Sequence, residues 1–172
     1  MRKLLIATTV TSILAIPAAE AATVTGSLTV SATLAASCSV NTSTTGTVTN
    51  AVLNFGTVTS MAANTDASTS STGGSKVTVL CSNGTGWTLA MNGGSNVSGT
   101  QRRMLGGNTE YVPYNLYSDS ARTVAIGVNT TALSGTGTGA LQSYDIYGRI
   151  PAGSTLATPG AYTDTVTLTL TY

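Results

Sequence analysis

Hydrophobic and polar residues alternate along much of this chain, and the clearest example lies near its start. From Ala22 to Leu34 every second residue is Ala, Val, Gly or Leu, and the residues between them are all Thr or Ser. Successive side chains of a β-strand point to opposite faces, so a period of two is typical of a half-buried strand. The pattern predicts a strand over residues 22–36, with one face that must be covered by a hydrophobic core.

The same period recurs through the rest of the sequence, interrupted by clusters of Gly, Asn and Ser. No stretch after residue 21 has sustained helical spacing of apolar residues, so the sequence predicts an all-β, immunoglobulin-like sandwich. Three polar stretches, 59–75, 92–100 and 134–139, are predicted to be connections without strands. The further strands are predicted at 52–58, 76–81, 86–91, 111–117, 142–149 and 162–172, with shorter ones at 101–105 and 123–126.

The last predicted strand, 162–172, is amphipathic and runs to the end of the sequence without a turn residue. Val166, Leu168, Leu170 and Tyr172 share one face, and threonines occupy the other. Native proteins rarely leave a long apolar edge exposed. We therefore expect an edge or an unfilled slot beside this strand, where another segment pairs.

Residues 1–21 have the features of a signal peptide. Arg2 and Lys3 precede an apolar stretch, which ends at the small-x-small sequence Ala19-Glu20-Ala21. A transmembrane helix is the competing interpretation, but interspersed Thr and Ser residues and Pro17 leave the stretch short of the roughly 20 apolar residues that a bilayer requires. The sequence predicts an exported chain that begins at Ala22.

Two cysteines, Cys38 and Cys81, remain after residue 21. Exported proteins fold in an oxidising compartment, so we expect a single structural disulfide. Closing a loop of this length stabilises the fold by about 4 kcal/mol in the chain-entropy model. A redox-active pair is disfavoured because the C-x-x-C spacing is missing.

The charge of the chain argues against several classes of partner. Only 8% of all residues are charged, and residues 22–172 contain five basic and five acidic residues, which gives a net charge of zero. Nucleic-acid binding requires clustered Lys and Arg, and we interpret Arg102-Arg103 as a solvated pair in a loop. Low charge also occurs in low-complexity tails, but 41% of residues are hydrophobic and alternate with polar ones, so the chain is predicted to fold.

The sequence offers little for catalysis or for metal binding. It has no histidine, which excludes Ser-His-Asp and Cys-His arrangements. Ser75 and Lys76 are adjacent on a predicted strand and face opposite ways, and the five acidic residues form no recognisable pair or ligand set. We predict no enzymatic activity, no cofactor and no metal.

Aromatic residues raise a sugar-binding alternative, because aromatic faces stack on carbohydrates. Trp87 and the series Tyr111, Tyr114 and Tyr117 are the candidates. Trp87, however, lies in a predicted strand where it is expected to fill the core, and tyrosines three residues apart on a strand alternate between faces.

Several local runs, in this order and spacing, resemble the spore coat protein U domain family. Within that family they are most similar to the major subunit of archaic, Csu-type chaperone–usher pili. The resemblance covers essentially all of the chain after residue 21. The runs are CSV at Cys38, NFGTV at 54–58, VTVLCSNGTGWTLAMNGG at 77–94, RRMLGG at 102–107, YNLYSD at 114–119, YDIYGRIPAG at 144–153 and PGAYTDTVTLTLTY at 159–172.

The resemblance implies a six-stranded, incomplete immunoglobulin-like fold whose seventh strand comes from another chain. A periplasmic chaperone supplies that strand first, and the N-terminal extension of the next subunit replaces it at an outer-membrane usher. Residues 22–34 would form this donor extension and 35–172 the pilin domain. The implied inward-facing donor residues are Val24, Gly26, Leu28, Val30 and Leu34, and the implied edge of the acceptor groove comprises Val166, Leu168, Leu170 and Tyr172.

The donor residues would contribute to assembly by leaving water. At about 1.5–3 kcal/mol for each fully buried aliphatic side chain, four of them give roughly 6–12 kcal/mol before the cost of ordering the segment. Gly26 is unusual on this face, because an inward glycine weakens a strand unless the backbone must approach a neighbour closely. By resemblance, Gly26 passes the tightest point of the groove.

The implied function is that of a rod subunit of a pilus, exported through the periplasm to the cell surface and supporting attachment and biofilm formation. Its partners would be identical subunits head to tail, the chaperone, the usher, and tip or minor pilins, with no nucleic acid. Three alternatives stay open. Residues 22–34 pair within their own chain, the protein is a structural spore-coat or matrix component, or it is a secreted glycan-binding sandwich.

Overall fold

A computed structural model describes residues 20–43 and 47–172 of the chain. The chain divides into two units, of which one ends at Thr33 and the other spans Leu34–Tyr172. Apart from Glu20 and Ala21, the predicted signal peptide lies outside the described residues. Within the described part, no helix is long and apolar enough to cross a membrane.

The unit Leu34–Tyr172 consists of strands and connecting loops, with no helix among its described residues. This confirms the all-β prediction. The strands are β1 (Cys38–Val40), β2 (Thr65–Ser68), β3 (Val77–Cys81), β4 (Gly86–Met91), β5 (Arg102–Gly106), β6 (Tyr111–Tyr117), β7 (Thr130–Thr136), β8 (Leu141–Tyr144), β9 (Tyr147–Ile150), β10 (Tyr162–Thr163) and β11 (Leu168–Thr171).

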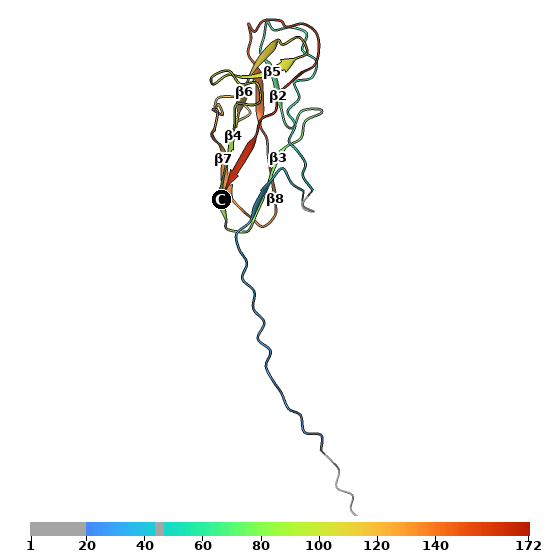
Figure 1. The fold of residues 1–172 in the computed structure, drawn as a ribbon, viewed down its shortest axis with the longest axis vertical. Coiled ribbons are helices and arrows are strands. Elements are labelled where there is room, and N and C mark those ends of the chain that lie inside the picture. The colour runs from blue at the N-terminus through green and yellow to red at the C-terminus, as the bar shows by residue number, and fades with distance from the viewer. Residues whose placement is uncertain (1–19, 44–46) are drawn as a thin grey trace, which may run out of the picture. The chain divides into compact units, whose positions relative to one another are not determined.

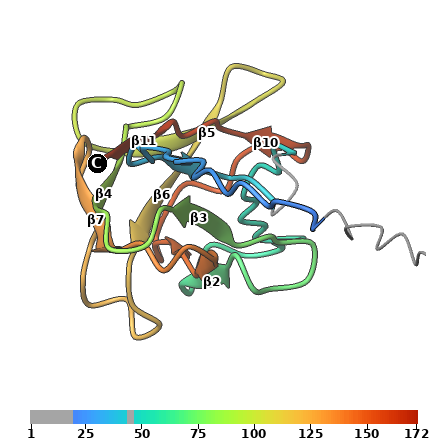
Figure 2. The same ribbon diagram turned by 90° about the horizontal axis from the view of Figure 1, so that it is seen from below.

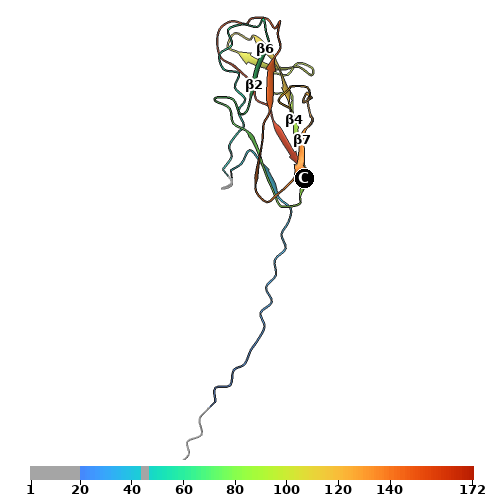
Figure 3. The same cartoon turned by 180° about the vertical axis from the view of Figure 1, so that it is seen from behind.

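The strands form three antiparallel sheets, in the orders β1-β3-β8, β11-β4-β7 and β10-β5-β6-β9-β2. The strands β3, β8, β4 and β7 gather at one end of this unit, and β2, β5 and β6 at the other (Figures 1 and 3). The Trp87 ring on β4 meets the Tyr144 ring on β8 edge to face at 5.4 Å, so the two three-stranded sheets face each other across the core. This arrangement is consistent with an immunoglobulin-like sandwich.

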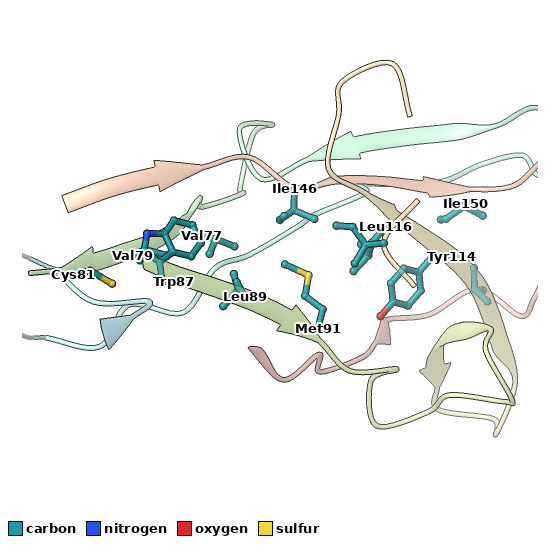
Figure 4. Close-up of a cluster of buried hydrophobic side chains, with 12 residues drawn as sticks. Val77, Val79, Cys81, Trp87, Leu89, Met91, Tyr114, Leu116, Ile146 and Ile150 are labelled. Carbon is teal, nitrogen blue, oxygen red and sulfur yellow. The ribbon is translucent and has the colours of Figure 1, made fainter. Parts of the chain in front are cut away.

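Alternating side chains build the core, as the sequence pattern predicts. In β3 the residues Val77, Val79 and Cys81 are buried and the residues between them are not, and Trp87, Leu89 and Met91 alternate in the same way on β4. Figure 4 shows the buried side chains of these strands pointing toward one another, with those of β6 and β9 continuing the row. The other buried hydrophobic residues of this cluster are Val112, Tyr114, Leu116, Ile126, Ile146 and Ile150.

Most predicted strands are present. The predictions over 86–91 and 111–117 agree with β4 and β6 residue for residue, while β3 and β5 differ from their predictions by one residue at an end or both. Two longer predictions are each divided into two strands. The first, 142–149, becomes β8 and β9, and the second, 162–172, becomes β10 and β11.

Four predictions of strands or connections beyond residue 36 are wrong. The stretch 59–75 contains β2, a polar strand held to β9 by the pairing of Asp66 with Arg149, which needs no apolar alternation. The stretch 134–139 is partly taken up by β7, because backbone pairing with β4 extends as far as Thr136. Conversely, 52–58 and 123–126 form no strand and make only isolated bridges, at Val52 and Ala125.

Candidate binding groove

Two edge strands border an open groove in the unit Leu34–Tyr172. Strand β1 pairs with β3, and β11 pairs with β4, but no ladder joins β1 to β11 among the described residues. Figure 2 shows β10 and β11 following each other along one side of this unit. The groove has a volume of about 730 Å³. Its apolar lining comprises Val40, Val48, Ala51, Val52, Leu53 and Phe55 on one wall, Tyr162, Val166 and Leu168 on the other, and Val77, Met91, Met104, Leu116 and Ile146 between them.

The backbone of both walls is oriented toward the groove at alternate residues. On the β11 side, the N–H of Asn92 donates to the carbonyl of Thr167, so Val166 and Leu168 direct their own N–H and C=O groups the other way. On the β1 side, the N–H of Asn41 donates to the carbonyl of Thr78, so Val40 likewise directs its groups toward the groove. Both walls can therefore accept a further strand.

A second cavity of about 450 Å³ adjoins the first. Both are lined by the stretch Leu53–Phe55, by Met104 and by Tyr162, and the second extends to Met61 and Leu156. The open surface is therefore elongated, as an extended peptide segment requires.

The groove lining contains one carboxylate, that of Asp164. Asp164 accepts a hydrogen bond of 2.6 Å from the hydroxyl of Tyr114, and its other oxygen accepts from the backbone N–H and side-chain NH₂ of Asn96, at 3.2 and 3.1 Å. Burial raises the pKa of Tyr114 far above its ordinary value, and the hydrogen bond to Asp164 raises it further. Tyr114 is therefore a permanent donor that holds this carboxylate in place.

A disulfide between Cys38 and Cys81 closes the start of the β1 wall, as predicted. These two residues are also direct partners in the β1–β3 ladder. Because β1 has only three residues, the covalent bond adds substantially to what its few hydrogen bonds supply.

The other unit contains the amphipathic segment 22–33, and no strand ladder includes residues 20–36. The predicted strand over 22–36 is therefore not formed in this structure. The side chains of Val24, Leu28 and Val30 are 95%, 88% and 84% exposed, and Leu34, at the start of the next unit, is 89% exposed. The apolar side chains of this segment are thus exposed, and its role as a donor strand stays a prediction.

The sequence matches the model of the Spore Coat Protein U domain over residues 24–169. The protein belongs to this family. A comparison with curated proteins finds no match.

The fold of this spore coat U chain is similar to that of a solved structure from Acinetobacter baumannii, the CsuC-CsuE chaperone-tip adhesion subunit pre-assembly complex of archaic chaperone-usher Csu pili. The TM-score is 0.53 and the sequence identity 23%, so the likeness concerns the fold. The match covers 81% of this chain and 40% of the other, so the chain spans two fifths of the length of the protein that it matches.

Of the four residues predicted to form the acceptor-groove edge in this spore coat U chain, only two line the observed groove. Val166 and Leu168 line it. Leu170 packs against the core, and Tyr172 is 60% exposed at the C-terminus. The roles of these residues, like those of the donor residues, stay predictions.

Sequence reasoning missed the second wall of the groove. Residues 48–55 are held by isolated bridges of Val48 to Thr42 and of Val52 to Ser75, and the sequence had predicted an ordinary strand over 52–58. Asn41 and Asp164, two of the polar residues in the lining, were missed as well. The run NGG at 92–94 is the one local signal that a tight turn lies nearby.

The interpretation of Arg102-Arg103 as a solvated loop pair is wrong. Arg102 belongs to β5, is 3% exposed and donates hydrogen bonds to the carbonyls of Met91, Asn92, Ile126 and Gly127. Burial lowers the pKa of this guanidinium, and four carbonyl acceptors compensate for its lost hydration. The guanidinium of Arg102 thereby links β5 to residues 91–92 and to residues 126–127.

The aromatic residues considered for sugar stacking do not form one surface. Trp87 is buried, as predicted, and is therefore unavailable to a ligand. Tyr114 is buried and Tyr111 exposed, which confirms that this series alternates between faces. The guanidinium of Arg103 covers the ring of Tyr111 at 4.0 Å.

Proposed function

We propose that this protein is a structural, non-enzymatic subunit of a chaperone–usher pilus that polymerises by donor-strand complementation. In this proposal, residues 22–34 of one copy occupy the groove of the next copy. The observation that carries it is the presence, in a single chain, of an apolar groove between two edge strands and of an exposed, alternating segment without a partner. The groove lacks a strand between its two edges, and the segment lacks a cover for its apolar face.

The physics of the two features supports the pairing. Val24, Leu28, Val30 and Leu34 would transfer from water to an apolar lining, at about 1.5–3 kcal/mol each. The inserted backbone would pair with the N–H and C=O groups that Val40, Val166 and Leu168 direct into the groove. Gly26, without a side chain, would pass where the walls are closest.

We propose a rod subunit rather than a tip subunit. A copy with one groove and one extension both receives and donates a strand, and such a head-to-tail contact does not close on itself, so it propagates as a fibre. The domain boundaries of the proposal are a signal peptide at 1–21, the donor extension at 22–34 and the pilin domain at 35–172.

The same proposal places the subunit on the cell surface after passage through the periplasm. Its partners would be identical subunits, a periplasmic chaperone, an outer-membrane usher, and tip or minor pilins, and the fibre would support attachment and biofilm formation. Membership of the spore coat U family supports this, as does the likeness in fold to a chaperone-subunit complex of Csu pili.

The name of the family favours one second candidate, a structural spore-coat or matrix protein. Such a protein would use the same groove for assembly but without an usher. Genes for a chaperone, a usher and a two-domain tip protein beside this one would support the pilus, and their absence from the genome would favour the coat.

The experiment compares Leu28→Asp with Thr29→Asp, two substitutions that add the same charge to opposite faces of the extension. Leu28→Asp would bring a carboxylate into the apolar groove, so we expect it to reduce multimers at least tenfold. Thr29→Asp should assemble like the unchanged protein. Multimers are quantified by gel filtration of the full chain after release from a co-expressed chaperone.

The chaperone complex serves as the folding control, since the extension is not part of the groove that the chaperone would fill. Leu28→Asp should still be recovered in that complex at the level of the unchanged protein. Normal multimers of Leu28→Asp, or equal losses for both substitutions, would contradict donor-strand assembly.

A further inference from the structure

Asn41 lies at the end of β1, in the wall of the groove. Its backbone has a φ of 51°, a left-handed conformation that Asn tolerates better than most residues. Its N–H donates to the carbonyl of Thr78 at 2.8 Å, and its own carbonyl accepts from the N–H of Thr49 at 2.7 Å. The peptide groups of Asn41 are therefore fully used within the chain.

The side chain of Asn41 is different. The residue is 9% exposed and contributes to the lining of the groove, and its side-chain oxygen is buried without a hydrogen-bond partner among the described residues. By contrast, Asn54 in the same lining accepts a hydrogen bond from the N–H of Gly56. A buried amide oxygen without a hydrogen-bond partner is unfavourable and rare in native structures.

The position of Asn41 indicates what its partner is. A strand that lies along β1 can pair with the backbone of Val40. Beyond Val40 the edge is already occupied, because the carbonyl of Asn41 accepts from the N–H of Thr49 and the N–H of Ser43 donates to the carbonyl of Thr47. The ladder that β1 offers thus stops at Asn41. A side-chain amide carries a C=O and an NH₂ group, the same functions as a peptide group, and rotation about its last torsion directs either of them toward the groove.

We infer that Asn41 is a positioning residue of the groove, whose side-chain amide forms a hydrogen bond with the backbone of segment 22–34 from a second copy. The inference rests on the proposed function, since it names a contact within that assembly. Segment 22–34 is the occupant because its apolar face is exposed to water and the groove offers an apolar lining that would cover it. The amide then continues the β1 ladder beyond the point where the backbone can.

The test uses Asn41→Gly in the full chain, because glycine adopts a φ of 51° without strain and has no amide. The rate at which isolated multimers dissociate in urea should rise roughly three- to tenfold, the effect of losing one hydrogen bond. The unfolding midpoint of the monomeric fraction should stay the same or rise, since an unpaired buried group is removed. A merely structural role of Asn41 would instead lower this midpoint.

Asn129→Gly is the matched control. Asn129 also has a positive φ, of 57°, but it is exposed and does not line the groove. Its multimers should dissociate at the rate of the unchanged protein, and an acceleration equal to that of Asn41→Gly would overturn the inference.

The remaining outcomes separate the inference from the proposed function. Multimers of Asn41→Gly that dissociate as slowly as the unchanged ones overturn the role of Asn41 and leave donor-strand assembly intact. If the unchanged protein forms no multimers, or if Leu28→Asp does not abolish them, the proposed function fails and the inference fails with it. If Asn41→Gly does not fold, Asn41→Ala decides, because it keeps the Cβ atom and removes both functions of the amide. Faster dissociation supports the inference and an unchanged rate overturns it.

Discussion

At the residue scale, the position of Asp164 in the groove wall depends on a glycine. Gly94 has a φ of 83°, and a Cβ atom at this position would collide with the carboxylate of Asp164. That carboxylate receives hydrogen bonds from Tyr114 and Asn96. The turn after β4 is therefore compatible with Asp164 in the wall only because residue 94 has no side chain.

Gly94→Ala should destabilise the subunit by about 1–3 kcal/mol, since it adds both backbone strain and a steric clash. The measurement is the urea midpoint of unfolding. Gly107→Ala is the control, because no atom lies within 4 Å of its Cβ position, and it should change stability by less than about 0.5 kcal/mol. Equal midpoints for the two variants would show that the turn relaxes around the added methyl group.

At the scale of elements, one of the shortest strands, β1, forms part of a wall of the groove. β1 has three residues and pairs on one side only, with β3. Its remaining anchor is the bond between Cys38 and Cys81, which are 43 residues apart in the sequence. The disulfide thus fixes one side of the groove while leaving the backbone edge of β1 open.

Replacing both cysteines by alanine should lower the free energy of unfolding by about 4 kcal/mol, as expected for opening a loop of this length. Equilibrium unfolding in urea measures the change. Reduction of the unchanged protein by dithiothreitol should reproduce most of it, which distinguishes the loss of the covalent link from a packing effect of alanine. A double variant as stable as the oxidised protein would contradict this role.

At the scale of the whole molecule, charge has little part in the proposed assembly. Residues 22–172 have no net charge, and segment 22–34 contains no charged residue. The single carboxylate of the groove wall is paired with neutral donors of its own chain. Apolar burial and backbone hydrogen bonds would then hold the subunits together.

Multimers should therefore dissociate at nearly the same rate in low salt and in ~1 M NaCl, where the Debye length is only about 3 Å. Dilution followed by gel filtration measures this rate. We expect a change of less than about twofold. A tenfold acceleration in high salt would reveal ion pairs between subunits and would count against an assembly built on the uncharged segment.

The sequence alone was sufficient for the features that depend on neighbours along the chain. Alternation located β4 and β6 to the residue, because one face of each strand is buried and the other is not. Two cysteines in an exported chain were enough to predict the disulfide. The polar strand β2 was not predicted, since an edge strand held by Asp66 and Arg149 shows no alternation of apolar residues.

Which edges stay open was decided by the tertiary structure. The alternation of 22–34 shows that one face needs a cover, but that pattern is the same whether the cover lies in the same chain or in another. The groove itself arises where residues 48–55 and 162–168, more than a hundred residues apart, fail to pair. The burial of Arg102 likewise depends on carbonyls from other chain segments, and the unpaired side-chain oxygen of Asn41 depends on the groove around it. The energy of a buried polar group is set by what surrounds it in space.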